Sequence, residues 1–536
     1  MSDLQVHWIA LAVFVGLFLF VTALGFVAAR WKPGDLNLLD EWGLGGRRFG
    51  IIITWFLVGG DLYTAYTIIA VPALVYSVGA YGFFAIPYAI IIYPFVFAIM
   101  PRLWTACRRS GHLTAADFVH ERYGHGGLAL AVAVTGLIAT MPYIALQLVG
   151  IQVVIDRLGL GNGDLPLIVA FVILALYTYT SGLRAPAMIA FVKDVMIYVV
   201  VFAAVLVIPV QLGGYGAVFD GAGKVFQSKG GATGLTLKPA QMLPFASLAL
   251  GSALALFMYP HSVTGMLSSS SSRAVRWNAI LLPAYTLLLG LVALLGYMAI
   301  AYGIKVSNPN EVVPAFFDRI FPEWFAGFSF AAIAIGALVP AAIMSIGAAN
   351  LFTRNIWKPL LRPQISSREE ATIAKIVSLV VKLGALLFII FLPHAICHRS
   401  SAPWRDLDAP DLAFCCTWTL SIAVSRHRSV SGMVSGYGGR NLALCAGGPQ
   451  TGLRGTRVWE CFCGLYRGFS VDNQLRGLFR RVATLVVPAK SRFLPGIFMM
   501  FSDKCAKDPS PRLAAEVFAP PSCFPSSLRG VTFSRI

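Results

Sequence analysis

Long apolar runs, separated by short polar or charged stretches, fill the first three quarters of the chain. Most of them reach the length of about 20 residues that a helix needs to cross a bilayer. The pattern therefore predicts an all-α protein that crosses a membrane many times. The ten runs lie near residues 8–29, 50–75, 82–101, 127–155, 166–181, 187–211, 242–268, 277–304, 325–353 and 372–393.

The second run is interrupted by the segment Gly59-Gly60-Asp61-Leu62-Tyr63-Thr64. Two adjacent glycines and a carboxylate are costly at this depth, because hydrocarbon offers no water to free backbone groups or to a charge. Helices tolerate such a break where it lines a cavity, and many transporters build a site at the midplane in this way. We therefore expect a solute site here.

A second interruption lies five spans further along the chain, in the run 242–268. Pro260, followed by His261, removes a backbone donor inside this run and is expected to kink or break the helix. Transporters built from inverted repeats have interrupted helices at matching positions of their two halves. The spacing predicts that 50–75 and 242–268 are the first and sixth helices of a core of two five-helix repeats.

Charge along the chain predicts how these helices are oriented. The formal net charge is +18, with 12% charged residues and a mean hydropathy of +0.74. Since basic loops stay in the cytoplasm, the N-terminus is expected outside. The partner implied by this pattern is the lipid bilayer and not a nucleic acid. The basic residues that follow odd-numbered runs are Arg30, Lys32, Arg47, Arg48, Arg102, Arg108, Arg109, Arg122, Arg184, Arg273, Arg276, Arg354, Lys358, Arg362 and Arg368.

The chain changes character after Pro393. Residues 1–393 contain one cysteine and residues 394–536 contain eight, together with 18 Lys and Arg against 8 Asp and Glu. The segment His398 to Leu407 can be encoded so that a shift of one nucleotide reads Ile-Asp-Leu-Gln-Leu-Leu-Gly-Gly-Ile-Trp, an apolar sequence of the kind expected in a membrane. We therefore predict that 394–536 is the product of a frameshift; the alternative is a genuine soluble, basic tail.

Several segments, in this order, resemble the sodium–solute symporter family, and within it the bacterial permeases for lactate, pyruvate and acetate. The resemblance covers residues 1–393. It implies cation-driven uptake by alternating access across the inner membrane of a bacterium, which requires no covalent chemistry. No enzymatic activity is expected, because the His-Glu-x-x-His, Gly-x-Ser-x-Gly and phosphate-loop patterns are absent from the spans. The segments that carry it are 55–67, 71–73, 141–150, 177–186, Lys193-Asp194, Tyr259-Pro260-His261, 340–345 and 350–354.

The resemblance also implies an organisation of the chain. Residues 1–49 are expected to form a first span and a cytoplasmic loop, and 50–211 the first repeat. Residues 212–241 are expected to form an external loop before the second repeat, 242–393. The tenth core helix would follow residue 393, so the second repeat is expected to be incomplete and transport by the chain as written to be weak or absent.

The family's sodium site implies the backbone carbonyls of Gly59 and Leu62, together with Ala342 and Ser345 on the eighth core helix. Hard cations prefer several oxygen ligands, and a broken helix frees carbonyls to provide them. Ile346 stands where family members usually have a second hydroxyl, which leaves sodium and proton as alternative coupling ions. No other cofactor is implied.

Two carboxylates are further candidates for the path of the cation. Asp61 lies beside these ligands and is expected to tune the cation site or carry a proton, the alternative being a carboxylate satisfied by backbone N–H groups. Asp194, next to Lys193, matches an acidic position of the family. Its alternative is a local pair that reaches toward the cytoplasmic end of its helix.

A carboxylate substrate needs donors other than arginine, because no arginine lies near the middle of a span. Hydroxyl, amide and imidazole groups near the two breaks are therefore the substrate candidates. Other readings of the chain are a channel-like or sensory protein on the same scaffold, or an inactive product. The candidates are Tyr63, Thr64, Thr67, Tyr259 and His261, with Tyr143 and Gln147 on one face of the third core helix.

Overall fold

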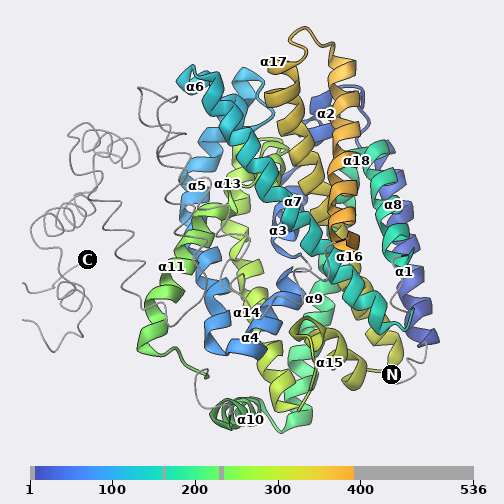
Figure 1. Cartoon of the computed structure of the whole chain (residues 1–536), viewed down its shortest axis with the longest axis vertical. Helices are drawn as coiled ribbons and strands as arrows, with labels where there is room; N and C mark the ends of the chain where they lie inside the picture. Colours follow the sequence, from blue (N-terminus) through green and yellow to red (C-terminus); the bar gives the residue numbers. More distant parts are fainter. Residues whose placement is uncertain (1–6, 65, 161–164, 229–233, 392–536) are drawn as a thin grey trace, which may run out of the picture. The chain divides into compact units, whose positions relative to one another are not determined.

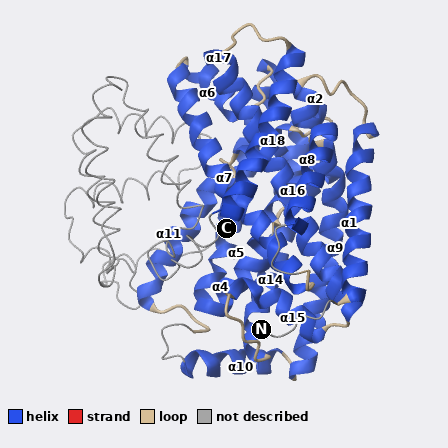
Figure 2. Ribbon diagram, turned by 45° about the vertical axis from the view of Figure 1, so that its right-hand side comes forward, coloured by secondary structure: helices blue, strands red, loops and turns tan. Residues whose placement is uncertain are grey.

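The computed structural model describes residues 7–64, 66–160, 165–228 and 234–391, all within the compact unit Met1–Pro449. The regular structure of these residues is helical, with only two isolated β-bridges besides (Figure 2). The expected all-α class is confirmed. The expected tail 394–536 and the missing tenth core helix lie outside the described residues.

The first repeat begins with an interrupted helix. α3 (Ile51–Leu62) ends at the expected break, and the chain resumes as η3 (Tyr66–Ala70) and α4 (Val71–Val78). The helices around it are α1 (Trp8–Val27), α2 (Leu39–Leu44), α5 (Ala85–Ser110), α6 (Ala115–Tyr123), α7 (Gly126–Arg157), α8 (Leu165–Ser181) and α9 (Arg184–Leu212).

The second repeat begins with the other interruption. α11 (Pro239–Leu256) and α12 (Pro260–Leu267) are separate helices, because Pro260 starts a new helix at its first position, where a missing N–H costs nothing. Both expected breaks are therefore present. The remaining helices are α10 (Tyr215–Ser228), α13 (Ser272–Leu281), α14 (Pro283–Ala301), α15 (Val312–Ile320), α16 (Glu323–Phe352), α17 (Lys358–Leu360) and α18 (Ser367–Phe391).

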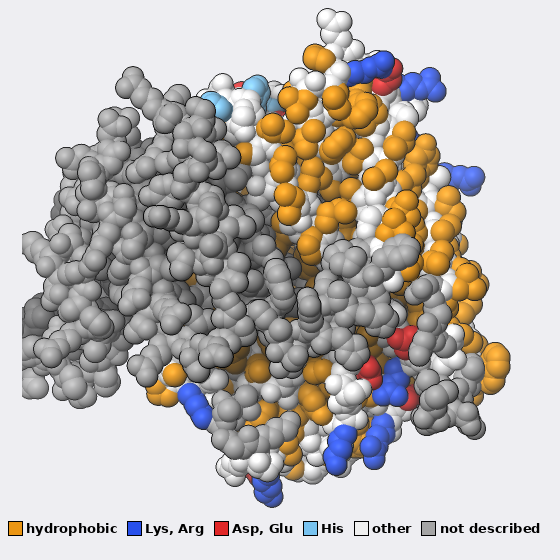
Figure 3. All heavy atoms as spheres, in the orientation of Figure 1, with side chains coloured by type: hydrophobic (Ala, Val, Ile, Leu, Met, Phe, Trp, Pro, Cys, Tyr) orange, Lys and Arg blue, Asp and Glu red, His pale blue; other side chains and the backbone are white. Residues whose placement is uncertain are grey.

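Seven of the helical segments in the described part are long and apolar enough to cross a membrane. α3 and α4, the two halves of the interrupted span, are shorter apolar helices. The 17-residue α8 is also shorter, as its run 166–181 predicts. Where Figure 3 shows described residues, hydrophobic side chains predominate on the right-hand side of the face, and lysine and arginine side chains lie mostly toward its top and bottom. The protein is a multi-pass membrane protein.

The connections separate into two groups at opposite ends of the bundle (Figure 1). The short helices α2, α6 and α17 lie at one end, and α10 and α15 lie at the other. This is the alternation that the basic residues predict, because α2, α6 and α17 belong to connections after odd-numbered runs.

α16 forms the centre of the bundle. All residues from 329 to 351 are buried, and the helix packs against α1, α7, α9, α12 and α18. Its small residues allow this close packing: a Cβ on Gly347 would lie 3.0 Å from the backbone of Pro260 and His261 in α12. α16 therefore holds the second broken helix against the core.

Candidate functional site

The two glycines at the end of α3 allow neighbouring helices to approach its backbone. A Cβ on Gly59 would lie 2.1 Å from the ring of Tyr285, and a Cβ on Gly60 would lie 2.9 Å from the carboxylate of Asp194. Each position therefore requires a residue without a side chain. Gly59 allows α14 to pack closely against α3, and Gly60 allows α9 to do so.

Lys193 of α9 fills the space that Gly60 leaves open. Its ammonium donates to the backbone carbonyls of Gly60, at 2.5 Å, and of Tyr63, at 2.8 Å. A carboxylate oxygen of Asp194 lies 3.1 Å from the same Nζ atom. Both side chains are buried, with 0% and 1% exposed, so the pair lies against the break and does not reach along α9 to the membrane surface.

Two tyrosines continue this cluster into α14. The hydroxyl of Tyr285 donates to Asp194 at 2.7 Å, and the hydroxyl of Tyr63 donates to the backbone carbonyl of Tyr285. The ring centroids of Tyr63 and Tyr285 are 5.0 Å apart. The carboxylate, the ammonium and the two phenols are thereby held in one buried cluster behind the first break.

Asp61 connects the two broken helices. Its Oδ2 atom lies 3.5 Å from Nε2 of His261 and accepts a hydrogen bond of 3.4 Å from the hydroxyl of Ser262. Its Oδ1 atom has no hydrogen-bond partner among the described residues. An incompletely satisfied buried carboxylate is costly, which is typical of a functional group inside a membrane protein.

Two aromatic side chains pack beside His261. The ring centroids of Tyr143 and Tyr259 lie 5.6 and 5.1 Å from that of His261, and 5.7 Å from each other. Gln147, one turn along α7 from Tyr143, is fully buried and donates to the Tyr143 carbonyl at 3.3 Å. Four of the expected substrate residues therefore come together next to Asp61.

The remaining expected residues lie on either side of this cluster. Thr64 and Thr67 are buried next to the break. The Gly59 carbonyl accepts the Tyr63 N–H at 3.3 Å, as in an ordinary helical turn. Leu62 is the last residue of α3, so its carbonyl lies at the end of this helix.

The hydroxyl expected on α16 is part of a separate polar chain. Ser345 donates to the Ala342 carbonyl at 2.8 Å, and its oxygen lies 3.2 Å from the hydroxyl of Ser378 in α18. Lys382 donates to Ser378 at 2.8 Å and is 1% exposed. Among the described residues, no group of three or more His, Cys, Asp and Glu side chains is placed to hold a metal ion.

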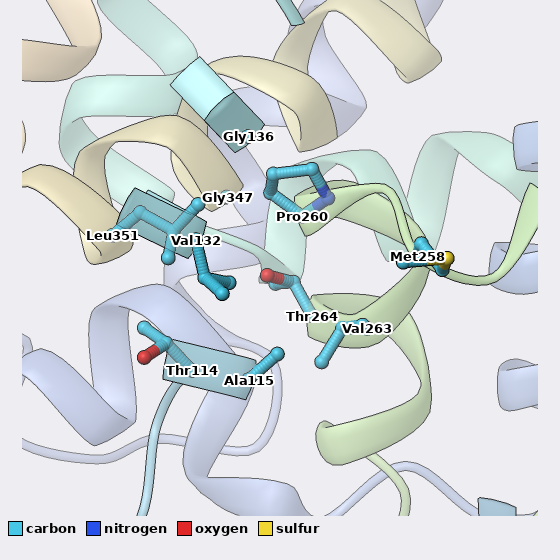
Figure 4. A pocket seen from close by; sticks show the side chains of 10 residues that line it. All are labelled: Thr114, Ala115, Val132, Gly136, Met258, Pro260, Val263, Thr264, Gly347 and Leu351. Atoms are coloured by element: carbon cyan, nitrogen blue, oxygen red, sulfur yellow. The ribbon is translucent and has the colours of Figure 1, made fainter. Parts of the chain in front are cut away.

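A hollow with about 320 Å³ of empty space, part of it open to solvent, lies beside α12. Two threonine side chains, Thr114 and Thr264, give it hydroxyls in a mostly apolar lining from α7, α12 and α16 (Figure 4). Pro260, the neighbour of His261, is part of that lining. The hollow therefore lies next to the second break, and Asp61, Tyr143, Tyr259 and His261 are not part of its lining.

Sequence reasoning missed four members of these clusters: Ser262, Tyr285, Ser378 and Lys382. Lys382 carried a usable signal, because a lysine inside an apolar run marks a functional position in a membrane helix. Tyr285 and the two serines carried none, since tyrosine and serine are common in membrane helices and only the packing of distant helices brings these to the site.

A model of the sodium:solute symporter family matches residues 42–438. The chain belongs to this family. As a member it is a membrane transporter coupled to a cation. The match extends past Pro393, where the resemblance in the sequence was expected to end.

Relatives agree with this assignment, and a solved structure shows the same fold. A protein named "Monocarboxylate transport permease protein" from Rhizobium johnstonii is 64% identical over 390 residues, which cover 73% of this chain and 79% of the relative. The "Uncharacterized symporter YodF" of Bacillus subtilis is 35% identical over the same shares of both chains. A Na⁺-coupled sialic acid symporter in an outward-open state has the same fold, with a TM-score of 0.62, 18% identity, and coverage of 72% of this chain and 83% of that one.

Proposed function

We propose that this symporter takes up short monocarboxylates together with a cation, by alternating access, across the inner membrane of a bacterium. The N-terminus would lie outside, and the end that carries α2, α6 and α17 would face the cytoplasm. The observation that carries the proposal is the meeting of the two broken helices at Asp61, His261 and Ser262, beside the rings of Tyr143 and Tyr259.

The residues at this meeting point suit a small carboxylate. Imidazole, phenol and hydroxyl groups donate hydrogen bonds to a carboxylate, and the aromatic rings accommodate a short carbon chain. The close spacing of the rings of Tyr143, Tyr259 and His261 favours a solute of a few carbon atoms. The name of the 64% identical relative from Rhizobium johnstonii supports the same class of substrate.

The charges nearby support coupling to a cation. Asp61 and Asp194 bring two carboxylates to this region, and Lys193 brings one ammonium. A solute anion that enters alone adds further negative charge where water is scarce, and such a charge is costly unless it is paired. Entry together with a cation removes that cost.

Binding of ¹⁴C-pyruvate and ¹⁴C-lactate to the purified protein in nanodiscs tests the proposal. We expect saturable binding that unlabelled short monocarboxylates displace and that proline does not. His261→Gln should weaken binding at least tenfold, because it removes the imidazole at the junction of the two helices. His120→Gln, at an exposed position of α6, is the matched control. Displacement by proline as strong as by lactate would contradict the proposed substrate class.

A further inference from the structure

The family implies a sodium ion near the first break, where most of the oxygen atoms that could bind it are engaged in hydrogen bonds within the protein. The Gly59 carbonyl accepts an N–H in its own helix, and the carbonyls of Gly60 and Tyr63 accept from the Lys193 ammonium. On α16, the Ser345 hydroxyl donates to the Ala342 carbonyl, and Ile346 offers no side-chain oxygen. A hard cation needs several free oxygen atoms at once.

We propose that Lys193 is a tethered cation that takes the place of a free sodium ion at the break of α3. An ammonium is a compact point charge with three donors, and here three oxygen atoms lie within 3.1 Å of it: two freed carbonyls and the Asp194 carboxylate. The carbonyls are those of a residue and its third neighbour at the end of a broken helix, the geometry in which unwound backbone coordinates ions in transporters.

Within the part of the chain that the structure describes, two carboxylates act on the charge of Lys193. Asp194 on its own helix and Asp61 on α3 are the carboxylates that act on its charge, and Tyr285 of α14 reaches it through Asp194. The apolar helices α1, α14 and α16, which also pack against α9, contain no Asp, Glu, Lys or Arg within residues 8–27, 283–301 and 324–352. The ammonium can bind at the break because Gly60, which lies opposite it, has no side chain.

This inference rests on the proposed function and makes it more specific. A charge fixed to α9 keeps the broken end of α3 closed against α9 without an ion from solution. The free coupling cation must then use oxygen atoms elsewhere. Lys193 acts here as a positioning residue for the break and not as a ligand of the solute.

Thermal unfolding of the full chain in nanodiscs tests the inference, with sodium chloride compared against potassium chloride at equal ionic strength. We expect the melting temperature of the unaltered protein to be the same in both salts. Lys193→Ala frees the carbonyls of Gly60 and Tyr63 beside Asp194, so its melting temperature should rise with the logarithm of the sodium concentration and not with potassium. Lys193→Arg, which keeps a tethered cation, should not acquire this response.

Two results would overturn the inference. One is a sodium-specific rise of the same size in the unaltered protein, and the other is a folded Lys193→Ala protein that does not respond to sodium. If Lys193→Ala does not fold, Lys193→Thr, which keeps a polar group near the carbonyls, takes its place in the same comparison. Stabilisation by pyruvate, measured separately in potassium chloride, reports on the proposed function; its absence would count against that function and leave the sodium comparison valid.

Discussion

At the scale of single residues, the two glycines of α3 have different neighbours and the same physical role. Gly59 admits the ring of Tyr285, and Gly60 admits the charged pair of α9. The backbone of a membrane helix is normally shielded by its own side chains. Removing two of them exposes carbonyls that a neighbouring helix can reach, and Lys193 does so.

Gly60→Ala is predicted to destabilise the protein by about 1–3 kcal/mol, as overpacking of a close contact usually does. The added Cβ would lie 2.9 Å from an Asp194 oxygen and 3.1 Å from Nζ of Lys193. The charged pair must then move away from the break. Gly50→Ala, just before α3, is the matched control, because a Cβ there meets no atom within 4 Å. Thermal unfolding of both variants measures the difference, and equal melting temperatures would contradict the prediction.

At the scale of helices, the sequence predicted the two breaks because each has a local cause: a Gly-Gly-Asp segment in one run and Pro260 in the other. It predicted His261 and Asp61 separately, and the structure brings them to 3.5 Å. It did not predict the contact of Lys193 with α3. That contact depends on the rotation of α9 against α3, which no local pattern specifies, and a lysine near a helix end has the equally plausible alternative of reaching the membrane surface.

The connections at the end that carries α6 and α17 are joined by a polar network. Asn355 of η6 (Thr353–Trp357) donates to Asp117 at 2.7 Å and accepts from Thr114 at 2.8 Å. Arg354 lies 3.6 Å from Asp117 and donates to Glu370 of α18 at 3.0 Å. The network ties α6, in the first repeat, to η6 and α18 in the second, across the end of the bundle near the hollow beside α12.

Asn355→Ala is predicted to loosen this end of the bundle. It removes two hydrogen bonds from buried or half-buried partners, at a cost of about 1–3 kcal/mol. Because Thr114 also caps α6, hydrogen exchange of residues 113–123 should become faster, while exchange in α15 at the opposite end stays the same. Asn310→Ala, at that opposite end, is the control for a lost amide. Unchanged exchange in 113–123 would show that the network does not hold α6.

At the scale of the whole molecule, the described helices account for nine of the ten helices that two five-helix repeats require. α3–α4, α5, α7, α8 and α9 form the first set, and α11–α12, α13–α14, α16 and α18 form four members of the second. A repeat that lacks its last helix leaves apolar surface on its neighbours unpaired. The sequence after Pro393 has the composition of a basic, cysteine-rich chain, although the family match extends into it as far as residue 438.

Restoring the alternative reading frame after Pro393 is predicted to increase uptake of ¹⁴C-lactate at least tenfold over the chain as written. The physical reason is that alternating access requires one repeat to move against the other as a unit, and an incomplete repeat cannot move as one. Uptake by cells that produce each form in equal amounts, judged by membrane immunoblot, measures the effect. His261→Gln in the restored form serves as the control for transport through the proposed site. Equal uptake by the two forms would mean that the basic tail completes the second repeat, and that the frameshift hypothesis is wrong.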